Sequence, residues 1–116
     1  MDVTDFLPQV MEILDEISDD LTDMNAVFQL ELKNTQTETY QLKITAGKSK
    51  WAEGTPFAAT CTIKISVKDF RDLMQGKMNP TVALLTGKVK IQGDRKQLQK
   101  LQSILKKHYR DVPEIF

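Results

Sequence analysis

The segment from Ile65 to Asp94 constrains the fold of this chain more than any other part of its sequence. Gly76, Gly87 and Gly93 divide it into two short helical stretches and one alternating stretch. Almost every apolar residue in the segment falls on one face of its predicted helix or strand. None of its residues forms a pattern suited to catalysis. The segment therefore indicates a domain that shelters an apolar molecule rather than one that transforms it.

Capping residues predict where the two helices of this segment begin. Ser66 and Asp69 resemble a capping box, with Asp in place of the usual Glu. The helix that follows can end at Gly76 in a left-handed conformation. Asn79 followed by Pro80 is a typical start of a second, short helix.

Alternation of apolar and polar residues predicts five strands. The alternating stretches are residues 28–33, 40–45, 49–53, 60–66 and 88–92. Residues 34–37, Asn-Thr-Gln-Thr, are typical of a hairpin turn between the first two strands. Because the stretches have one apolar and one polar face, we expect an antiparallel sheet that is wet on one side.

Two longer amphipathic helices are predicted at the ends of the chain. The first has apolar residues at helical spacing, namely Val3, Phe6, Leu7, Val10, Ile13, Leu14, Ile17 and Leu21. The second is capped by Asp94 with Gln97, and its apolar stripe contains Leu98, Leu101, Ile104, Leu105 and Tyr109. We expect the helices to cover the dry side of the sheet, which gives an α+β fold.

Charge is distributed unevenly along a chain whose net charge is zero. Residues 1–23 contain eight acids and no Lys or Arg, whereas residues 88–110 contain eight bases and one acid, Asp94. The two ends therefore attract each other, or they give the protein an acidic and a basic side. The plain interpretation is two solvated helix faces. The alternative is that the basic segment meets anionic membranes, where each Lys or Arg contributes about 1 kcal/mol.

Length and composition predict one domain over residues 1–116. No apolar run approaches the ~20 residues that span a bilayer, and the acidic N-terminus lacks the features of a secretory signal. Cys61 is the only cysteine, which excludes an internal disulfide and suits a reducing compartment. The chain does not end in a peroxisomal Ser-Lys-Leu address. We therefore expect a cytoplasmic protein.

Reactive side chains are too few to predict an enzyme. Alternation places Cys61 on the dry side, where a thiol is usually inert, and His108 is interpreted as a solvated helix residue. These two residues lie 47 positions apart and do not by themselves form a nucleophile and base. Metal-ligand spacings, phosphate loops and stacking aromatics among the bases are also lacking. We predict no catalytic residues, no cofactor, no metal and no nucleic acid partner.

Two motifs carry a resemblance to a known family. They are Gly-Lys-x-Asn-Pro at residues 76–80 and Gly-Lys-hydrophobic-x-Ile-x-Gly-Asp at residues 87–94, and Trp51 followed by Gly54 also fits upstream. The chain resembles the sterol carrier protein 2 family, in its stand-alone form. This resemblance implies a five-stranded, mostly antiparallel sheet with helices packed on one face, enclosing an apolar tunnel. It also implies non-catalytic binding or transfer of a fatty acid, fatty acyl-CoA, phospholipid or sterol-like ligand.

Candidate site residues follow from the apolar covering layer and the basic end. The lipid-binding candidates are Trp51, Phe70, Leu73, Met74, Met78, Val82, Leu84, Leu85, Leu101 and Leu105. The candidates for contact with a membrane or with CoA phosphates are Lys100, Lys106, Lys107 and Arg110. For every apolar candidate, ordinary core packing is the alternative. Trp51 either closes one end of the cavity or covers the sheet edge.

Further alternatives concern the tail and the interior. Phe57, Ile115 and Phe116 are hypothesised to form a lid over the cavity. If the interior is filled, the chain is instead a protein-interaction module, or an accessory to a lipid-modifying enzyme. Edge strands also permit a homodimer.

Overall fold

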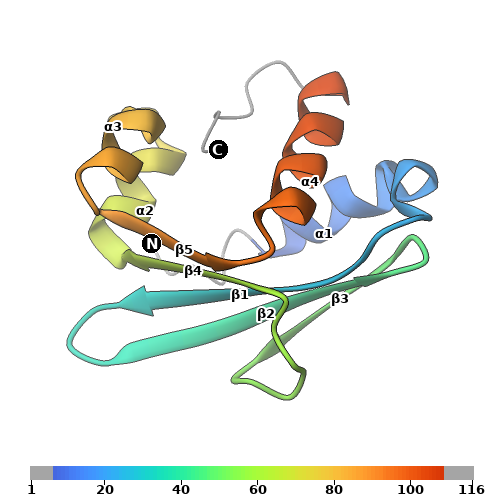
Figure 1. Ribbon diagram of the computed structural model, residues 1–116, viewed down its shortest axis with the longest axis horizontal. Helices are drawn as coiled ribbons and strands as arrows, with labels where there is room; N and C mark the ends of the chain where they lie inside the picture. Colours follow the sequence, from blue (N-terminus) through green and yellow to red (C-terminus); the bar gives the residue numbers. More distant parts are fainter. Residues whose placement is uncertain (1–6, 109–116) are drawn as a thin grey trace.

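A five-stranded sheet with helices on one face forms the frame of the molecule (Figure 1). The computed structural model describes residues 7–108, except for the side chains of Leu7 and Met74. The elements in chain order are α1 (Leu7–Glu16), the 3-10 helix η2 (Ser18–Leu21), β1 (Asn25–Lys33), β2 (Thr37–Thr45), β3 (Lys48–Glu53), β4 (Cys61–Ser66), α2 (Val67–Met74), α3 (Pro80–Leu85), β5 (Val89–Gly93) and α4 (Arg95–His108). Within this range no helix is long and apolar enough to cross a membrane.

The strands are ordered β3-β2-β1-β4-β5. The pairs β1–β2, β2–β3 and β4–β5 are antiparallel, whereas β1 and β4 run parallel, with Phe28 opposite Cys61 and Leu32 opposite Ile65. The predicted α+β class and mostly antiparallel sheet are therefore confirmed. The expectation that the first four strands are wholly antiparallel was wrong, because alternation reveals the faces of a strand but not its partner.

The core lies between the sheet and the helices. Figure 1 shows α1, α2, α3 and α4 on the same side of the sheet, as predicted. Leu32 and Ile44 from the sheet, together with Leu14 and Ile17 from α1, are at most 2% exposed. Cys61 also faces this covered side and is buried, which confirms its predicted orientation. Burial raises the pKa of its thiol, so the buried sulfur is a poor nucleophile at neutral pH.

The predicted caps all form. The Asp69 N–H donates to Ser66 Oγ (3.0 Å) at the start of α2, and the Thr81 N–H donates to Asn79 Oδ1 (2.9 Å) at the start of α3. Asp94 caps α4 in the same way, with Oδ1 accepting from the Lys96 N–H at 3.0 Å. These local contacts fix where each helix leaves the sheet.

The loop between β3 and β4 crosses the outer face of the sheet, opposite the helices (Figure 1). Gln41 holds it there, because its Oε1 accepts from the Phe57 N–H (3.0 Å) and its Nε2 donates to the Phe57 carbonyl (2.9 Å). The Lys43 amine lies 4.6 Å from the centroid of the Phe57 ring. The structure therefore contradicts the lid hypothesised for Phe57, which lies on the wrong face. Ile115 and Phe116 lie outside the described residues.

Candidate functional site

An apolar cavity of about 240 Å³ lies between the sheet and the helices. Strands β1 to β4 form its floor, and α1, α2 and α4 form its roof. The lining side chains include Phe28, Leu30, Tyr40, Leu42, Trp51 and Ile63 from the strands, and Val10, Met11, Phe70, Leu98 and Leu101 from the helices. An engineered apolar cavity of about 150 Å³ already binds benzene, so this space has room for a hydrocarbon segment.

One side chain of α1 that borders the cavity is partly exposed to solvent. Val10 lines the cavity and is 38% exposed, while Leu14, one turn later on α1, is buried in the core. On the floor, Leu30, Tyr40 and Trp51 remain half-buried although helices lie over this face of the sheet. A packed core would bury such side chains almost completely. We conclude that the helices cover the sheet without filling the space above these strands.

Two aromatic rings form one wall of the cavity. Tyr40 and Trp51 lie on neighbouring strands with ring centroids 5.8 Å apart at a tilt of 46°. The Tyr40 hydroxyl donates to Glu38 Oε2 at 3.0 Å, which gives the apolar wall a polar outer tip. Trp51 lies on the edge strand β3, and its side chain lines the cavity.

Comparison with known proteins identifies the family. Residues 9–106 match the sequence model of the SCP-2 sterol transfer family. The chain belongs to this family. Membership assigns the domain to lipid binding or transfer in general, and it agrees with the resemblance carried by the two glycine motifs.

Curated relatives extend well beyond this domain. Sterol carrier protein 2 of Gallus gallus is 33% identical over 84 residues, which are 70% of this chain and 15% of that protein. Hydroxysteroid dehydrogenase-like protein 2 of Bos taurus is 30% identical over 95 residues, which are 80% of this chain and 23% of that protein. The chain thus spans less than a quarter of the length of these relatives.

Solved structures share the fold. The apo form of sterol carrier protein 2 from Yarrowia lipolytica has a TM-score of 0.61 and 25% identity, with 85% of this chain and 78% of that chain covered. Palmitated SCP2L2 from Aedes aegypti has a TM-score of 0.71 and 20% identity, with 90% and 95% covered. The second likeness concerns the fold alone.

The apolar candidates of this family member fall into three groups. Trp51, Phe70 and Leu101 line the cavity. Leu73 is buried in the core, and Met78, Leu84 and Leu105 are partly buried against it. Val82 and Leu85 are 52% and 81% exposed, and the side chain of Met74 is not described. Contact of these residues with lipid stays a prediction.

The exposure of Val82 and Leu85 has a simple cause. Helix α3 has six residues and buries only Ala83 fully, at 0% exposed. Such a short helix presents too few positions to cover the sheet with more than one face. Sequence spacing placed its apolar residues in the covering layer, but it could not show that α1 and α4 would form the roof instead.

Several cavity residues were missed from sequence. Val10 belongs to the predicted stripe of the first helix, and Leu30, Leu42 and Ile63 belong to the predicted dry faces of strands, whereas Met11 was not part of the predicted stripe. The apolar spacing of these residues was visible in the sequence, so a signal existed for the face on which they lie. It did not separate residues that line a void from residues that pack against a neighbour, because both are apolar.

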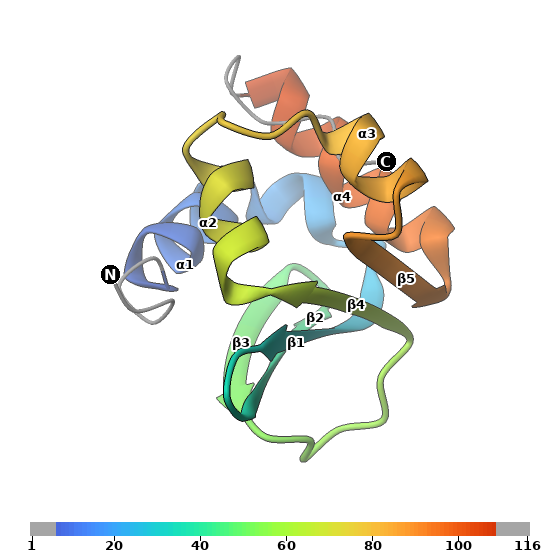
Figure 2. The same ribbon diagram turned by 90° about the vertical axis from the view of Figure 1, so that its left-hand side faces the viewer.

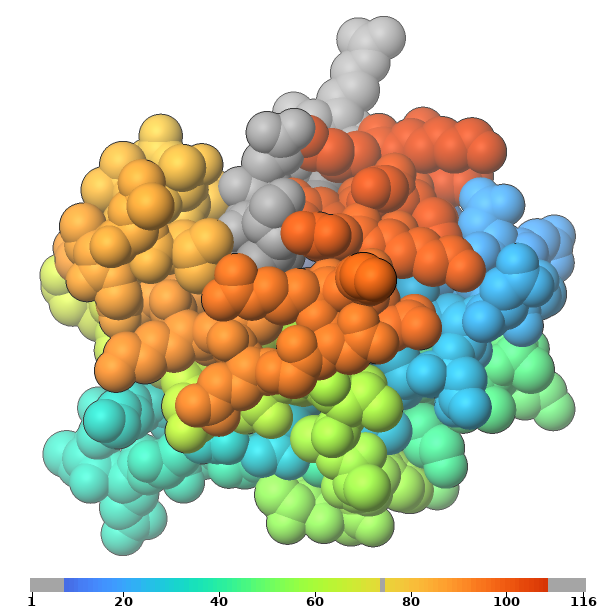
Figure 3. Space-filling model, in the orientation of Figure 1, coloured from blue at the N-terminus to red at the C-terminus, as the bar shows by residue number. Residues whose placement is uncertain are grey.

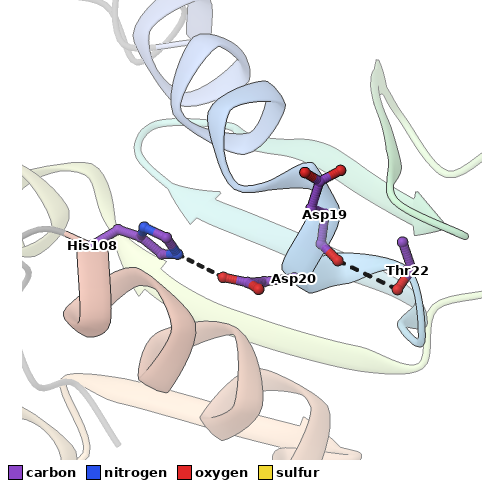
Figure 4. Close-up of polar contacts among 4 residues, drawn as sticks. All are labelled: Asp19, Asp20, Thr22 and His108. Carbon is purple, nitrogen blue, oxygen red and sulfur yellow. Dashed lines mark hydrogen bonds and ion pairs between the residues drawn. The ribbon is translucent and has the colours of Figure 1, made fainter.

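A contact between η2 and the end of α4 joins the acidic and basic parts of the chain. His108, at the end of α4, donates from Nε2 to Asp20 Oδ2 in η2 at 2.6 Å (Figure 4). This hydrogen bond, aided by the charge of Lys107, holds the pKa of Asp20 below its ordinary value. His108 is an exposed helix residue as predicted, but its partner was not foreseen. Lys100 and Lys107 are exposed on α4, and Arg110 lies outside the described residues.

Replacing Asp20 with asparagine tests this contact. A carboxylate whose folded pKa is lowered stabilises the fold above its unfolded pKa, and this contribution is lost as pH falls through the folded pKa. Asp20→Asn is therefore expected to lower the Tm by about 1–3 °C at neutral pH and to have a smaller effect at about pH 3, below the ordinary pKa of an aspartate. Thermal unfolding followed by circular dichroism at both pH values measures the difference.

Asp19 provides a matched control for this prediction. Asp19 lies in the same turn as Asp20. Its backbone carbonyl accepts a hydrogen bond from the Thr22 hydroxyl (3.4 Å; Figure 4). Asp19→Asn removes the same charge without removing the hydrogen bond to His108. Equal losses of Tm in the two variants would show that net charge, rather than the contact with His108, is responsible.

Proposed function

We propose that this domain binds lipid non-catalytically by enclosing an acyl chain in the cavity between α1, α4 and the sheet. The cavity itself is the observation that carries the proposal: it is apolar, bordered by the partly exposed Val10 and formed by residues from seven elements. Each CH₂ group transferred from water into such a space contributes about 0.8 kcal/mol. A natural core leaves few voids larger than a water molecule, so a space of this size is expected to have an occupant.

Cavity size favours a chain over a ring system. Pockets for drug-sized ligands usually measure about 300–1,000 Å³, and this one measures about 240 Å³. A single acyl chain needs a narrow space, whereas a sterol needs a broad one. Fatty acids, or the acyl chains of an acyl-CoA or phospholipid, are therefore placed ahead of sterols. The palmitated SCP2L2 from Aedes aegypti, which shares the fold, supports this order.

The alternative role as a protein-interaction module requires a filled interior. The open cavity and the half-buried floor residues Leu30 and Trp51 argue against it. Among the described residues, no group of three His, Cys, Asp or Glu side chains could hold a metal ion. In this proposal the domain carries its ligand unchanged.

Native mass spectrometry tests the proposal directly. We expect the protein, as purified, to carry fatty acid or phospholipid, or to take up one equivalent of palmitate when delipidated. Trp51 lies in the cavity wall, so its emission is expected to change during the titration, and a sterol is expected to bind more weakly. A delipidated protein that takes up neither palmitate nor sterol would overturn the proposal.

Contact with a membrane is proposed for the basic end of the chain. Lys100, Lys106, Lys107 and Arg110 would meet anionic headgroups while the ligand transfers. Surface charges are screened at high salt, since the Debye length falls to about 3 Å at 1 M. Transfer from anionic vesicles would then slow as salt is raised, while transfer from neutral vesicles would not.

A further inference from the structure

The outer face of the sheet concentrates lysines that lie far apart in the sequence. Strand register places Lys33, Lys43, Lys48, Lys50, Lys64 and Lys90 on this face, away from the helices. Two pairs stand directly opposite each other on neighbouring strands, Lys43 with Lys50 and Lys64 with Lys90. Like charges in such positions repel and destabilise the pairing of strands. Solubility alone does not require lysines to stand opposite each other on neighbouring strands, so these pairs need another explanation.

The pair Lys64 and Lys90 lies in a groove. This groove of about 460 Å³ lies where β1 and β4 end and β5 begins, and Lys33, Lys64, Lys88 and Lys90 line it together with Ser66 and Thr37. Figure 2 shows the ends of β1 and β4 beside β5 and the start of α2. Figure 3 shows β5 (orange) and the β1–β2 hairpin (teal) on either side of β4 at the lower left.

The four amines of the groove outnumber the two carboxylates that line it with them. The first acid, Glu31, lies opposite Lys64 in register, and its carboxylate also accepts a hydrogen bond from the Gln29 side chain at 2.8 Å. The second acid of the groove, Asp69, lies in the first turn of α2, where a negative charge suits the helix dipole. Within the described part of the chain, no carboxylate lies within 4.0 Å of any of the four amines. Lys64 is even half-buried.

We infer that this groove binds a small molecule that carries two or more phosphate groups. Several ammonium groups around a concave surface focus a positive potential, and the Ser66 and Thr37 hydroxyls add neutral donors. A polyanion placed between Lys64 and Lys90 would also relieve their mutual repulsion. The groove lies on the opposite face of the sheet from the apolar cavity, so the two sites are separate and the inference does not depend on lipid binding.

Isothermal titration with inorganic tripolyphosphate at physiological ionic strength tests the inference. The double variant Lys64→Gln/Lys90→Gln is expected to bind at least about tenfold more weakly than the wild type, because it removes two charged donors. The matched control is Lys43→Gln/Lys50→Gln, which removes the other opposed pair from the same face, outside the groove. This control is expected to change the affinity less than about threefold.

The source of the phosphates is resolved by a second measurement. Co-sedimentation with phosphatidylcholine vesicles that contain phosphatidylinositol bisphosphate would identify a lipid headgroup as the ligand, if it depends on Lys64 and Lys90 and tripolyphosphate does not bind. Binding of tripolyphosphate with the same dependence would identify a soluble polyphosphate.

Folding and lipid binding are checked in the same samples. Palmitate uptake should be unchanged in Lys64→Gln/Lys90→Gln, which separates this inference from the proposed lipid function. If that variant does not fold, Lys33→Gln/Lys88→Gln, which removes the other two lysines of the groove, is expected to show the same loss. Equal weakening in the control pair, or no binding of either probe by the wild type, would overturn the inference.

Discussion

Replacing Gly93 with alanine is expected to destabilise the fold by about 3–5 kcal/mol, a large share of the total for a domain of this size. Gly93 has φ of +96°, and a Cβ at this position would lie 2.4 Å from the Thr60 carbonyl oxygen. Thr60 cannot move away easily, because its N–H and hydroxyl both donate to the Val27 carbonyl, at 2.9 and 3.1 Å. Urea denaturation followed by circular dichroism measures the loss.

The variant Gly54→Ala serves as a control that separates the cost of backbone strain from the cost of the steric clash. Gly54 has φ of +80°, similar to Gly93, but a Cβ there would meet nothing within 4 Å. Gly54→Ala is therefore expected to cost only about 1–2 kcal/mol. If both variants lost the same stability, the close approach of Gly93 to Thr60 would contribute nothing. The prediction gives a physical reason for the final Gly-Asp of the second motif, since the Asp94 N–H also donates to Thr60 O at 2.8 Å.

Local features of the fold were predictable because they depend on residues close in sequence. Ser66 caps α2 through an N–H three residues away, and Asn79 caps α3 through an N–H two residues away. The two faces of each strand follow from alternation with a period of two. The five strands were predicted from that alternation and the position of the helices from their amphipathic spacing, the family resemblance implied the same arrangement, and the structure confirms it.

Long-range features were not predictable from the same signals. The parallel pairing of β1 with β4 joins residues 33 positions apart, as in Phe28 with Cys61. The position of Phe57 depends on its two hydrogen bonds to Gln41, 16 positions away. No pattern of neighbouring residues in the sequence indicates such contacts. The lysines of the outer face show the same limit, since each is an ordinary polar strand residue until the register places Lys64 opposite Lys90.

The sequence predicted that the candidate site would be apolar, but it identified only some of the residues that line it. Trp51, Phe70 and Leu101 line the cavity, but most of its floor comes from strand residues that the sequence assigned to the dry face without a special role. Whether an apolar side chain borders a void depends on how closely its opposite neighbour approaches. That distance depends on where α1 and α4 pack on the sheet. The apolar pattern of each helix does not determine this position.

Filling the cavity is expected to abolish acyl-chain binding. Leu30 lies on β1 between Tyr40 and Ile63 in register, and all three line the floor. Leu30→Trp would place an indole in the space above them, so palmitate uptake should fall at least about tenfold, which is the equivalent of about 1.4 kcal/mol. Because the new side chain enters a void, the Tm should stay level or rise. Native mass spectrometry and thermal unfolding measure the two effects.

Val82→Trp is the matched control for the plugged cavity. Val82 lies on α3, is 52% exposed and lies outside the described cavity lining, so the same indole should leave palmitate uptake unchanged. If Leu30→Trp lowers the Tm sharply, the smaller Leu30→Phe tests the same space with less overpacking. Uptake at the wild-type level by a folded Leu30→Trp would show that the acyl chain lies elsewhere. A loss confined to the Leu30 variants would place the chain above β1, because only there does the added volume compete with the ligand.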